Sequence, residues 1–472
     1  MRLYLWLSLV CTLLPGLGLA AATPGITGYW VGTLTVPGGT LHVVFHISKA
    51  GDDAYAATLD SPDQGAAGIP VDTVTLVDGT LTLVIDKIHG QFTGTIAADE
   101  TKITGNWTQG GGTLPLTLAR TEKLDTSKRP QEPKRPYPYQ EIEVTFPNVA
   151  AGVTLAGTLT EPKTEGKFPA VVLITGSGPQ DRDETVFNHK PFLIIADYLT
   201  RRGIAVLRVD DRGMGKSTGS LEKATTDDLV GDTLAAVNYL QTRADIDLTK
   251  IGLIGHSEGG MIAPLAATRA PEIAFIVLLA GPGIPGDRLL LTQNADMLRA
   301  SGVDEANIFI TVAIARELIA RVKKDPTAPD LPQQLTDYLT AAIAKLPDED
   351  RKSLGDNAAF IKTQVTALTS PWMRFFLNYD PAPALTRVVC PVLALNGDLD
   401  KQVSAKENLP AIQAALTAGG NRDATVKSLP GLNHLFQPCK TGAVNEYGKI
   451  ETTFSPDALK IISDWMLLHI KK

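Results

Sequence analysis

The sequence predicts an α/β protein with a mostly parallel sheet covered by helices on both faces, preceded by a small all-β domain. From about residue 141 onward, almost wholly apolar runs alternate with helical segments. Strands of that composition are typical of a parallel sheet that is buried on both faces. From residue 28 to about residue 120, short runs of alternating polarity are separated by Gly, Asp and Pro, as in antiparallel strands. At 472 residues, 44% of them hydrophobic, the chain is long enough for two or more domains with buried cores.

The N-terminal sequence MRLYLWLSLVCTLLPGLGLAAATPG predicts a secretory signal peptide over residues 1–22. It combines one arginine, an apolar run and the helix-breaking Pro15 and Gly16 with small residues at the end. We expect cleavage around Ala20–Ala22. An uncleaved anchor is the alternative, but the proline and glycines interrupt a span that should run about 20 apolar residues. No later segment is apolar for long enough to cross a membrane, so we expect a secreted or periplasmic protein without a membrane span.

Residues 23–121 predict a small up-and-down β-barrel or a sandwich of similar size, because short strands follow one another with short connections. About eight runs are strand-like: GYWVGTLTV, LHVVFHISKA, YAATLDSP, VDTVTLVDG, LTLVIDKIH, QFTGTIAAD, KITGNWTQG and TLPLTLART. His42 and His46 share one strand face, and His89 lies further along. We interpret these histidines as solvated or hydrogen-bonded side chains rather than as metal ligands.

Residues 122–140 predict a semi-rigid linker, since TSKRPQEPKRPYPYQ is rich in proline and charge. Its basic residues are interleaved with prolines, which favours a solvated spacer over a binding patch. The formal net charge of the whole chain is -7 and no basic block stands out, which argues against nucleic acid as a partner.

Residues 141–472 predict a second domain in which a parallel sheet follows an antiparallel opening pair, EIEVTF and VTLAGTLTEP. The expected parallel strands are PAVVLITGSG, IAVLRVD, KIGLIGHS, AFIVLLAGPG, CPVLALNGD and ATVKSLPGLNH. The expected helices between and after them are PFLIIADYLTRRG, TTDDLVGDTLAAVNYLQTR, GMIAPLAATRA, AKENLPAIQAALTAGG and SPDALKIISDWMLLHI. This alternation places ligand-binding loops at the carboxyl edge of the sheet.

Residues 284–385 interrupt the alternation with helical periods alone, which predicts a cap over the carboxyl edge of the sheet. The segments are DRLLLTQNADMLRASG, EANIFITVAIARELIARVKK, PQQLTDYLTAAIAKL and NAAFIKTQVTALTSPWMRFFL. Near its end, Trp372, Phe375, Phe376 and Tyr379 lie close together. This aromatic group is either a hydrophobic anchor between cap and core or the lining of an acyl pocket.

Gly255-His256-Ser257-Glu258-Gly259 fits the G-x-S-x-G pattern between a buried strand and a helix, and in that context the pattern predicts a nucleophile. Glycine lets the backbone fold tightly around Ser257. A serine hydroxyl needs a neighbouring base. His256 is adjacent in sequence but should point away from the apex, so we expect it to be structural.

Candidate acid and base groups follow Ser257 in the chain. LALNGDLDKQV brings Asp398 and Asp400 to the end of an apolar strand, and either could orient an imidazole. LPGLNHLFQ places His434 in the loop after the next strand, from where it can reach back to the serine. No metal-ligand cluster, phosphate-binding loop or dinucleotide fingerprint is present in the sequence, so we expect no cofactor.

From about Val171 to the end, the chain resembles bacterial α/β-hydrolases of the serine-esterase type. The resemblance lies in GSGPQDRDE, VDDRGMGKSTG, GHSEGG, LNGDLDKQV and LPGLNHLFQ. It implies the α/β-hydrolase fold and a Ser257–His434–Asp400 triad, with Asp398 as the alternative acid. This group is similar to both carboxylesterases and serine peptidases of the oligopeptidase and aminopeptidase kind. The β domain resembles the lipocalin-like domains that precede some bacterial esterases.

Within that fold, the tetrahedral oxyanion needs two N–H donors. We expect the backbone N–H of Glu258 to be one. The second is expected from the loop TGSGPQDRDE, with Ser177 preferred and Gly178 and Gln180 as alternatives. Asp211, Arg212 and Gly213 are expected to form a turn that braces the pocket.

The resulting functional hypothesis is an exported serine esterase that acts on small-molecule carboxylic esters of short chain length. An aminopeptidase or acyl-peptidase of the same fold is the enzymatic alternative, and a binding module with a vestigial hydrolase is the non-enzymatic one. The oligomeric state is left open. After signal cleavage only Cys390 and Cys439 remain. We expect two free thiols, because a core strand about 20 Å long separates their places.

Overall fold

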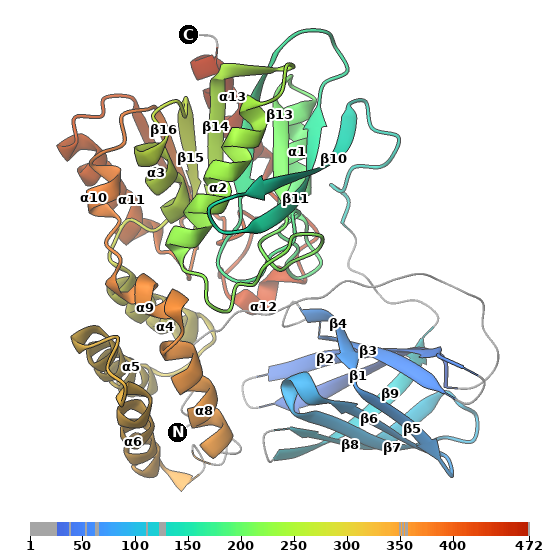
Figure 1. The fold of residues 1–472 in the computed structure, drawn as a ribbon. Coiled ribbons are helices and arrows are strands. Elements are labelled where there is room, and N and C mark those ends of the chain that lie inside the picture. The colour runs from blue at the N-terminus through green and yellow to red at the C-terminus, as the bar shows by residue number, and fades with distance from the viewer. Residues whose placement is uncertain are drawn as a thin grey trace.

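The structure is a computed structural model that describes residues 26–36, 39–51, 54–61, 66–109, 112–121, 129–348, 351, 354 and 357–470. The expected signal peptide, residues 1–22, lies outside the described residues, as does the first part of the expected linker, residues 122–128. An all-β unit precedes an α/β unit along the chain (Figure 1).

The all-β unit is one antiparallel sheet with the strand order β4-β3-β2-β1-β9-β8-β7-β6-β5. Its strands are β1 (Gly28–Val36), β2 (Gly39–Lys49), β3 (Tyr55–Ser61), β4 (Ala66–Val71), β5 (Thr73–Val77), β6 (Thr80–Ile85), β7 (Gly90–Ile96), β8 (Lys102–Gln109) and β9 (Gly112–Thr121). The two end strands, β4 and β5, are consecutive in the chain, and the sheet curls into a nearly closed barrel. Buried apolar side chains fill its interior, among them Trp30, Phe45, Phe92 and Trp107.

The sequence predicts about eight strands in this unit, whereas its described part has nine. The additional strand is β4, whose sequence AAGIPV contains Gly68 and Pro70. These residues are typical of turns in a sequence pattern. They are tolerated in β4 because the strand lies at the end of the sheet, where proline is accepted.

The α/β unit contains a sheet with the order β10-β11-β13-β12-β14-β15-β16-β17. Its strands are β10 (Gln140–Asn148), β11 (Val153–Glu161), β12 (Phe168–Ile174), β13 (Ala205–Val209), β14 (Ile246–His256), β15 (Phe275–Leu279), β16 (Val392–Gly397) and β17 (Ala424–Leu429). β10 and β11 pair antiparallel, β11 pairs antiparallel with β13, and the ladders from β13 to β17 are parallel. This is the predicted α/β architecture with an antiparallel opening pair.

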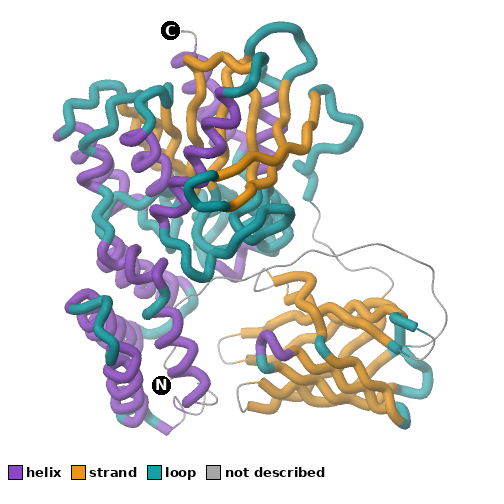
Figure 2. The backbone as a smooth tube through the Cα atoms, in the orientation of Figure 1, coloured by secondary structure: helices purple, strands orange, loops and turns teal. Residues whose placement is uncertain are grey.

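Helices cover both faces of this sheet (Figure 2). They are α1 (Pro191–Thr200), α2 (Thr226–Gln241), α3 (Gly259–Arg269), α11 (Ala405–Ala418) and α13 (Pro456–Ile470). Successive residues of β12 enter opposite cores: Val172 packs with apolar residues of α2, α3 and α11, and Val171 packs with those of α1 and α13. Because both faces are buried there, the inner strands β12 and β15 are apolar throughout, whereas the end strands β10 and β17 also carry exposed polar residues.

Only helices are described between β15 and β16, and we call them the cap helices. They are α4 (Gly286–Ala300), α5 (Glu305–Lys324), α6 (Leu331–Ala344), α8 (Asn357–Leu368), α9 (Pro371–Asn378) and α10 (Ala382–Leu385). The sequence predicts one helix over residues 357–377, but two are present. Ser370 caps α9 and Pro371 occupies its first turn, where proline is favoured. Met261 of α3 belongs to the apolar core of the cap helices, which therefore pack on the helix that follows Ser257.

Candidate active site

Ser257 lies at the turn between β14 and α3, where its backbone φ is +52°. A residue with a side chain rarely adopts this left-handed conformation, so its surroundings must hold it there. The Ser257 N–H donates to the Leu279 carbonyl on β15 at 2.9 Å, and the Gly260 N–H donates to the Ser257 carbonyl at 2.9 Å. A serine on a strained strand-to-helix turn of this kind is presented at the edge of the sheet.

Glycines beside the serine are required by close backbone approaches. A Cβ on Gly255 would lie 2.0 Å from the carbonyl oxygen of Gly259. A Cβ on Gly259 would lie 2.3 Å from the carbonyl oxygen of Ile174, at the end of β12. A Cβ on Gly260 would lie 2.5 Å from the Cα of Gly281. No side-chain movement can relieve these contacts, because each one is with backbone.

His434 and Asp400 form a buried pair in which Nδ1 of the imidazole is 2.8 Å from Oδ2 of the carboxylate. Their side chains are 5% and 0% exposed. Oδ1 of Asp400 accepts the backbone N–H groups of Gln402 at 2.7 Å and Val403 at 2.9 Å. The carboxylate is therefore fixed from its other side. An aspartate that accepts Nδ1–H leaves Nε2 of the histidine as the basic nitrogen.

Asp398, the alternative acid, has a different contact. Its Oδ1 accepts the backbone N–H of Gly431 at 2.7 Å, in the loop that follows β17. Within the described residues it makes no hydrogen bond with His434. The structure thus pairs Asp400 with the histidine and uses Asp398 to hold the loop that leads to it.

His256 links the Ser257 turn to His434. Its Nε2 is 3.0 Å from the His434 carbonyl oxygen, and the two imidazole centroids are 4.9 Å apart. In the described part of the chain, no hydrogen bond joins Ser257 Oγ to His434 Nε2. Such contacts are often long in an unliganded enzyme and tighten around the substrate. Both ring nitrogens of His256 are thus engaged by Glu184 and by the His434 carbonyl, which fits the structural role that the sequence predicts.

Glu184 is a site residue that the sequence did not reveal. Its buried Oε1 accepts the backbone N–H of Gly176 at 2.7 Å and lies 2.9 Å from Nδ1 of His256. Coulombic attraction to Glu184 and this hydrogen bond raise the pKa of His256 against the opposing effect of burial. Glu184 ends the quoted run GSGPQDRDE as the last of five consecutive charged or amide residues, a pattern that normally indicates solvent exposure. Its burial follows from the tertiary structure.

The expected oxyanion donors differ in their hydrogen bonds. The backbone N–H of Gln180 donates to Oδ2 of Asp211 at 2.9 Å and is thereby occupied. Within the described residues, the backbone N–H groups of Ser177, Gly178 and Glu258 make no hydrogen bond, so each could donate to a substrate oxygen. Of the three alternatives in this loop, Ser177 and Gly178 thus keep available donors. Their oxyanion role stays a prediction.

Asp211 anchors the loop that carries these donors. Besides Gln180, it accepts a hydrogen bond from Thr175 Oγ1 at 2.8 Å. Burial raises the pKa of the Asp211 carboxyl well above its usual range. The expected turn of residues 211–213 therefore contacts the loop of Ser177 and Gly178 through Asp211. Arg212 instead pairs with Asp232, with its Nε 2.7 Å from Oδ2.

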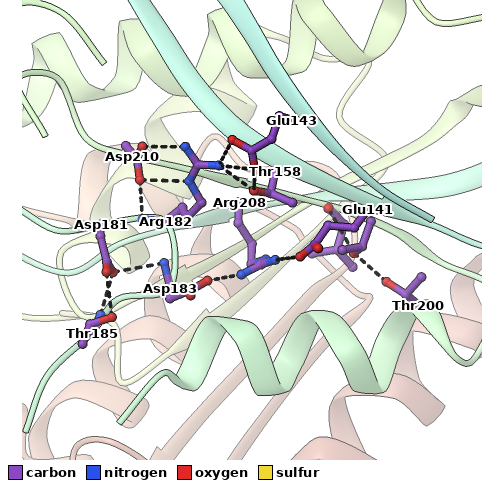
Figure 3. A network of polar contacts seen from close by, with 12 residues as sticks. Glu141, Glu143, Thr158, Asp181, Arg182, Asp183, Thr185, Thr200, Arg208 and Asp210 are labelled. Carbon is purple, nitrogen blue, oxygen red and sulfur yellow. Dashed lines mark hydrogen bonds and ion pairs between the residues drawn. The ribbon is translucent and has the colours of Figure 1, made fainter. Parts of the chain in front are cut away.

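A network of charged side chains holds the same loop further along (Figure 3). Arg182 donates from its backbone N–H and from Nε to Oδ1 of Asp210, at 2.9 and 3.0 Å. Its Nη1 reaches Glu143 on β10, with Oε1 at 2.8 Å. Next in the chain, Asp183 pairs with the buried Arg208 of β13. These ion pairs tie the loop to strands β10 and β13 just ahead of Glu184.

The Glu258 side chain is buried and faces the cap helices. Its Oε1 accepts Thr226 Oγ1 at 2.6 Å and the indole Nε1–H of Trp372 at 2.7 Å. Burial raises the pKa of the Glu258 carboxyl. Trp372 also stacks on Phe376, with ring centroids 5.4 Å apart, and Phe376 is buried in the core of the cap helices. Of the two interpretations of the aromatic group, these contacts favour an anchor between cap and core.

The remaining histidines of the α/β unit lie outside this constellation. His189 is fully buried between Thr453 Oγ1 at 2.8 Å and the Tyr447 carbonyl at 3.0 Å. His469 lies near Asp423 at the end of α13. Cys390 and Cys439 are free thiols, and burial raises the pKa of each to about 11. Among the described residues no group of His, Cys, Asp and Glu side chains is arranged to hold a metal ion, and no helix is long and apolar enough to span a membrane.

Comparisons with known proteins relate the chain to serine hydrolases. The profile of the family described as serine aminopeptidase, S33, matches residues 191–341. Esterase EstD of Thermotoga maritima is 28% identical over 282 residues, which are 60% of this chain and 58% of that protein. The Bacillus subtilis protein YtaP is 32% identical over 150 residues, 28% of this chain and 50% of that protein. The matched regions thus span 50–58% of the length of these relatives.

Est1E from Butyrivibrio proteoclasticus has a solved structure with bound ferulic acid. Its superposition on this protein covers 70% of this chain and 100% of the Est1E chain, at 18% identity and a TM-score of 0.39. The fold itself is established by the strand order of the α/β unit, with β10 and β11 antiparallel and the serine turn after β14. This topology is that of the α/β-hydrolase fold, and the matched profile and the similarity to EstD relate the chain to serine hydrolases of that fold.

Proposed function

We propose that the protein is a serine hydrolase that cleaves short-chain carboxylic esters through an acyl-enzyme intermediate on Ser257. The observation that carries the proposal is the buried His434–Asp400 pair, 2.8 Å apart, beside the strained turn that presents Ser257. A serine on such a turn with an oriented imidazole nearby is the arrangement used for acyl transfer on several folds.

In the proposed reaction, Ser257 Oγ attacks the ester carbonyl while His434 Nε2 takes the hydroxyl proton. The imidazolium then gives that proton to the departing alcohol oxygen as the C–O bond breaks, which leaves an acyl group on Ser257. A water molecule attacks the acyl carbon with His434 again as base, and the proton returns to Ser257 as the acid is released. Asp400 holds the imidazole tautomer and stabilises its positive charge in both steps.

The negative charge on the tetrahedral intermediate would be accepted by backbone N–H groups. Glu258 N–H and either Ser177 or Gly178 N–H are the available donors. Each such donor contributes about 3–4 kcal/mol to lowering the barrier in related active sites. Asp211 supports this role because it fixes the loop through Thr175 and Gln180.

Ester rather than peptide substrates are favoured by the state of Glu258. An aminopeptidase needs a negative group to bind the substrate ammonium. Glu258 is the carboxyl group closest in sequence to Ser257, but it is buried, its pKa is raised by burial, and its Oε1 is occupied by Thr226 and Trp372. The match to the serine aminopeptidase profile keeps peptide hydrolysis as the second candidate.

The test compares the parent protein with Ser257→Ala and with Ser301→Ala, an exposed serine at the end of α4 that serves as the matched control. The parent and the control should hydrolyse p-nitrophenyl acetate and butyrate and react with a fluorophosphonate at Ser257. Ser257→Ala should retain its circular dichroism spectrum and lose both reactions. Faster turnover of aminoacyl anilides than of short esters, compared as kcat/KM, would promote the peptidase. No turnover of either class would favour the binding module.

The proposal includes export, which rests on the order of charged, apolar and small residues in residues 1–22. In a bacterial host the full chain should be recovered from the periplasm or the medium with a new N-terminus near Ala21. Recovery from the cytoplasm with Met1 retained would contradict export and would leave the hydrolase proposal unaffected.

A further inference from the structure

The described end of the expected linker is bound to the α/β unit. We call residues 129–139 the strap. The sequence predicts a solvated spacer here, but several strap side chains contact the α/β unit. Tyr139 OH donates to Oδ1 of Asp197 at 2.9 Å, and the Tyr137 carbonyl accepts from Lys163 Nζ at 3.1 Å. The strap therefore lies against the catalytic unit.

Arg129 makes the most extensive of these contacts, because its guanidinium donates to four backbone carbonyls in two separate segments. The four acceptors are Phe187 at 2.9 Å from Nη2, Asn188 at 3.1 Å from Nε, Gly448 at 3.1 Å from Nη2 and Ile450 at 3.1 Å from Nη1. A guanidinium offers five N–H donors in a rigid plane, so it can join two chain segments in a way that an ammonium group cannot. Burial lowers the pKa of Arg129, and the carbonyl oxygens compensate part of that desolvation.

Gln131 joins the same region two residues later. Its Oε1 accepts the backbone N–H groups of Thr453 at 2.7 Å and Phe454 at 3.0 Å. Its Nε2 donates to the Phe454 carbonyl at 2.8 Å. The Gln131 side chain thus forms three hydrogen bonds with the backbone of Thr453 and Phe454, as a neighbouring strand would.

The two segments joined by Arg129 both carry residues of the candidate site. The first contains Glu184, which holds Gly176 and His256. It continues through Phe187 and Asn188, which have left-handed φ values of +51° and +59°. Residues of this kind keep such a conformation only where their surroundings hold it. The second segment, residues 430–455, connects β17 to α13 and carries His434.

A small apolar cluster connects the Arg129 contacts to the catalytic histidine. Phe187 and Tyr447 pack edge to face, with ring centroids 5.5 Å apart, and Leu435, the neighbour of His434, belongs to the same apolar cluster. The Tyr447 hydroxyl accepts a hydrogen bond from Gln402 Nε2 at 3.2 Å. Gln402 in turn donates its backbone N–H to Asp400. The carbonyls that Arg129 binds flank the ring residues of this cluster.

We infer that Arg129 and Gln131, outside the expected catalytic domain, are positioning residues for His434. Arg129 clamps the segment of Glu184 against the segment of His434, and Gln131 fixes the end of the latter. Only the expected change in kcat rests on the proposed function. The clamp itself concerns the order of the backbone, which hydrogen exchange reports without any activity. Loss of the clamp should misplace the imidazole, which lowers kcat because small displacements of catalytic groups are costly. KM should change little, since no strap residue is part of the candidate site.

The experiment uses the full chain with Arg129→Met, Arg129→Lys and Gln131→Ala. Arg135→Met is the matched control, because Arg135 is a second strap arginine whose side chain is 72% exposed and pairs with Glu141. Steady-state kinetics on p-nitrophenyl acetate give kcat and KM. Hydrogen exchange is measured in parallel over residues 182–190, 430–450 and, as an internal reference, strand β12.

Arg129→Met should lower kcat by about tenfold or more, with KM within about twofold, as expected for a misplaced catalytic group. Exchange should rise in residues 182–190 and 430–450 and not in β12. Arg129→Lys should recover part of kcat, Gln131→Ala should raise exchange in residues 430–450, and Arg135→Met should match the parent. Unchanged kcat and exchange in Arg129→Met, or a uniform rise in exchange that includes β12, would overturn the inference. If the parent hydrolyses no ester, the proposed function fails, while the exchange data still decide whether the clamp exists.

Discussion

The Trp372 indole N–H donates to the Glu258 carboxyl at 2.7 Å, and this hydrogen bond joins the cap helices to the residue that follows Ser257. Glu258 also supplies a backbone N–H that is available as an oxyanion donor. Its side chain accepts Thr226 Oγ1 at the start of α2 as well. One residue therefore connects the serine turn, a core helix and the cap, so that a shift of α9 would act directly on Glu258.

Trp372→Phe keeps an aromatic ring against Phe376 but removes the donor to Glu258. Removing one partner of a buried polar group costs about 1–3 kcal/mol, so thermal stability should fall. We also expect kcat/KM for short esters to fall several-fold, because the Glu258 backbone loses support from the cap. Steady-state kinetics and thermal unfolding measure the two effects.

Trp465→Phe is the matched control, because its indole donates to Thr425 Oγ1 at 3.2 Å at a distance from the serine turn. It should lose stability without a change in kcat/KM. Equal kinetic effects of the two substitutions would show that the Trp372–Glu258 contact has no special connection with the reaction.

The two aspartates of LNGDLDKQV should differ strongly in their effect on turnover. Asp400→Asn keeps the shape of the side chain but favours the wrong tautomer of His434, which should cost about 10⁴ in kcat. Asp398→Asn removes only a carboxylate contact with the Gly431 N–H, and we expect a far smaller loss. Both variants should retain the parent circular dichroism spectrum. A reversal of the two effects would assign the catalytic acid to Asp398.

The sheet and the serine turn could be predicted from sequence because their signals are local. Val171 and Val172 face opposite buried cores, which requires an apolar run that is visible without a structure. The glycines beside Ser257 reflect backbone approaches that hold for any sequence at this turn. The choice between Asp398 and Asp400 could be made only from a family resemblance, since it depends on which carboxylate the loop turns toward the imidazole.

The roles of Glu184 and Arg129 could not be predicted, for a physical reason. Glu184 is one charged residue in a loop rich in charge, and its buried carboxylate contacts Gly176, just after β12, and His256. Arg129 recognises backbone carbonyls, and carbonyls are present at every residue, so its partners leave no pattern in the sequence. A proline-rich, charged segment is typical of a spacer, and only the fold brings it against residues 187–188 and 448–450.

Shortened chains test the boundary of the catalytic unit. A chain of residues 127–472 retains Arg129 and Gln131 and should keep the kcat of the full protein. A chain of residues 141–472 should still fold, because it contains both apolar cores and the whole sheet except Gln140, the first residue of β10. Its kcat should nevertheless fall as it does in Arg129→Met. Size-exclusion chromatography shows whether each shortened chain is folded, and ester kinetics give its kcat. Insolubility of the longer chain would show that the all-β unit is needed by the α/β unit.

The stability of the α/β unit should depend on pH through His189. Burial lowers the pKa of this imidazole to about 4, against 6.5 for a free histidine. Between these values the unfolded chain binds a proton that the folded protein does not, so acidification favours unfolding. The contribution of His189 is fully present above pH 6.5 and is lost as the pH falls toward 4. Its loss should lower the free energy of unfolding by about 2 kcal/mol between pH 7 and pH 5.

His189→Gln should be less stable than the parent at pH 7, because it disturbs the contacts with Thr453 and Tyr447. Its free energy of unfolding should nevertheless fall less between pH 7 and pH 5, by about 2 kcal/mol. Unfolding in urea, monitored through hydrogen exchange in strand β12, reports on the α/β unit alone. His42→Gln, at an exposed position in the all-β unit, should reproduce the pH dependence of the parent. An identical pH dependence in His189→Gln would mean that His189 titrates normally in the folded protein.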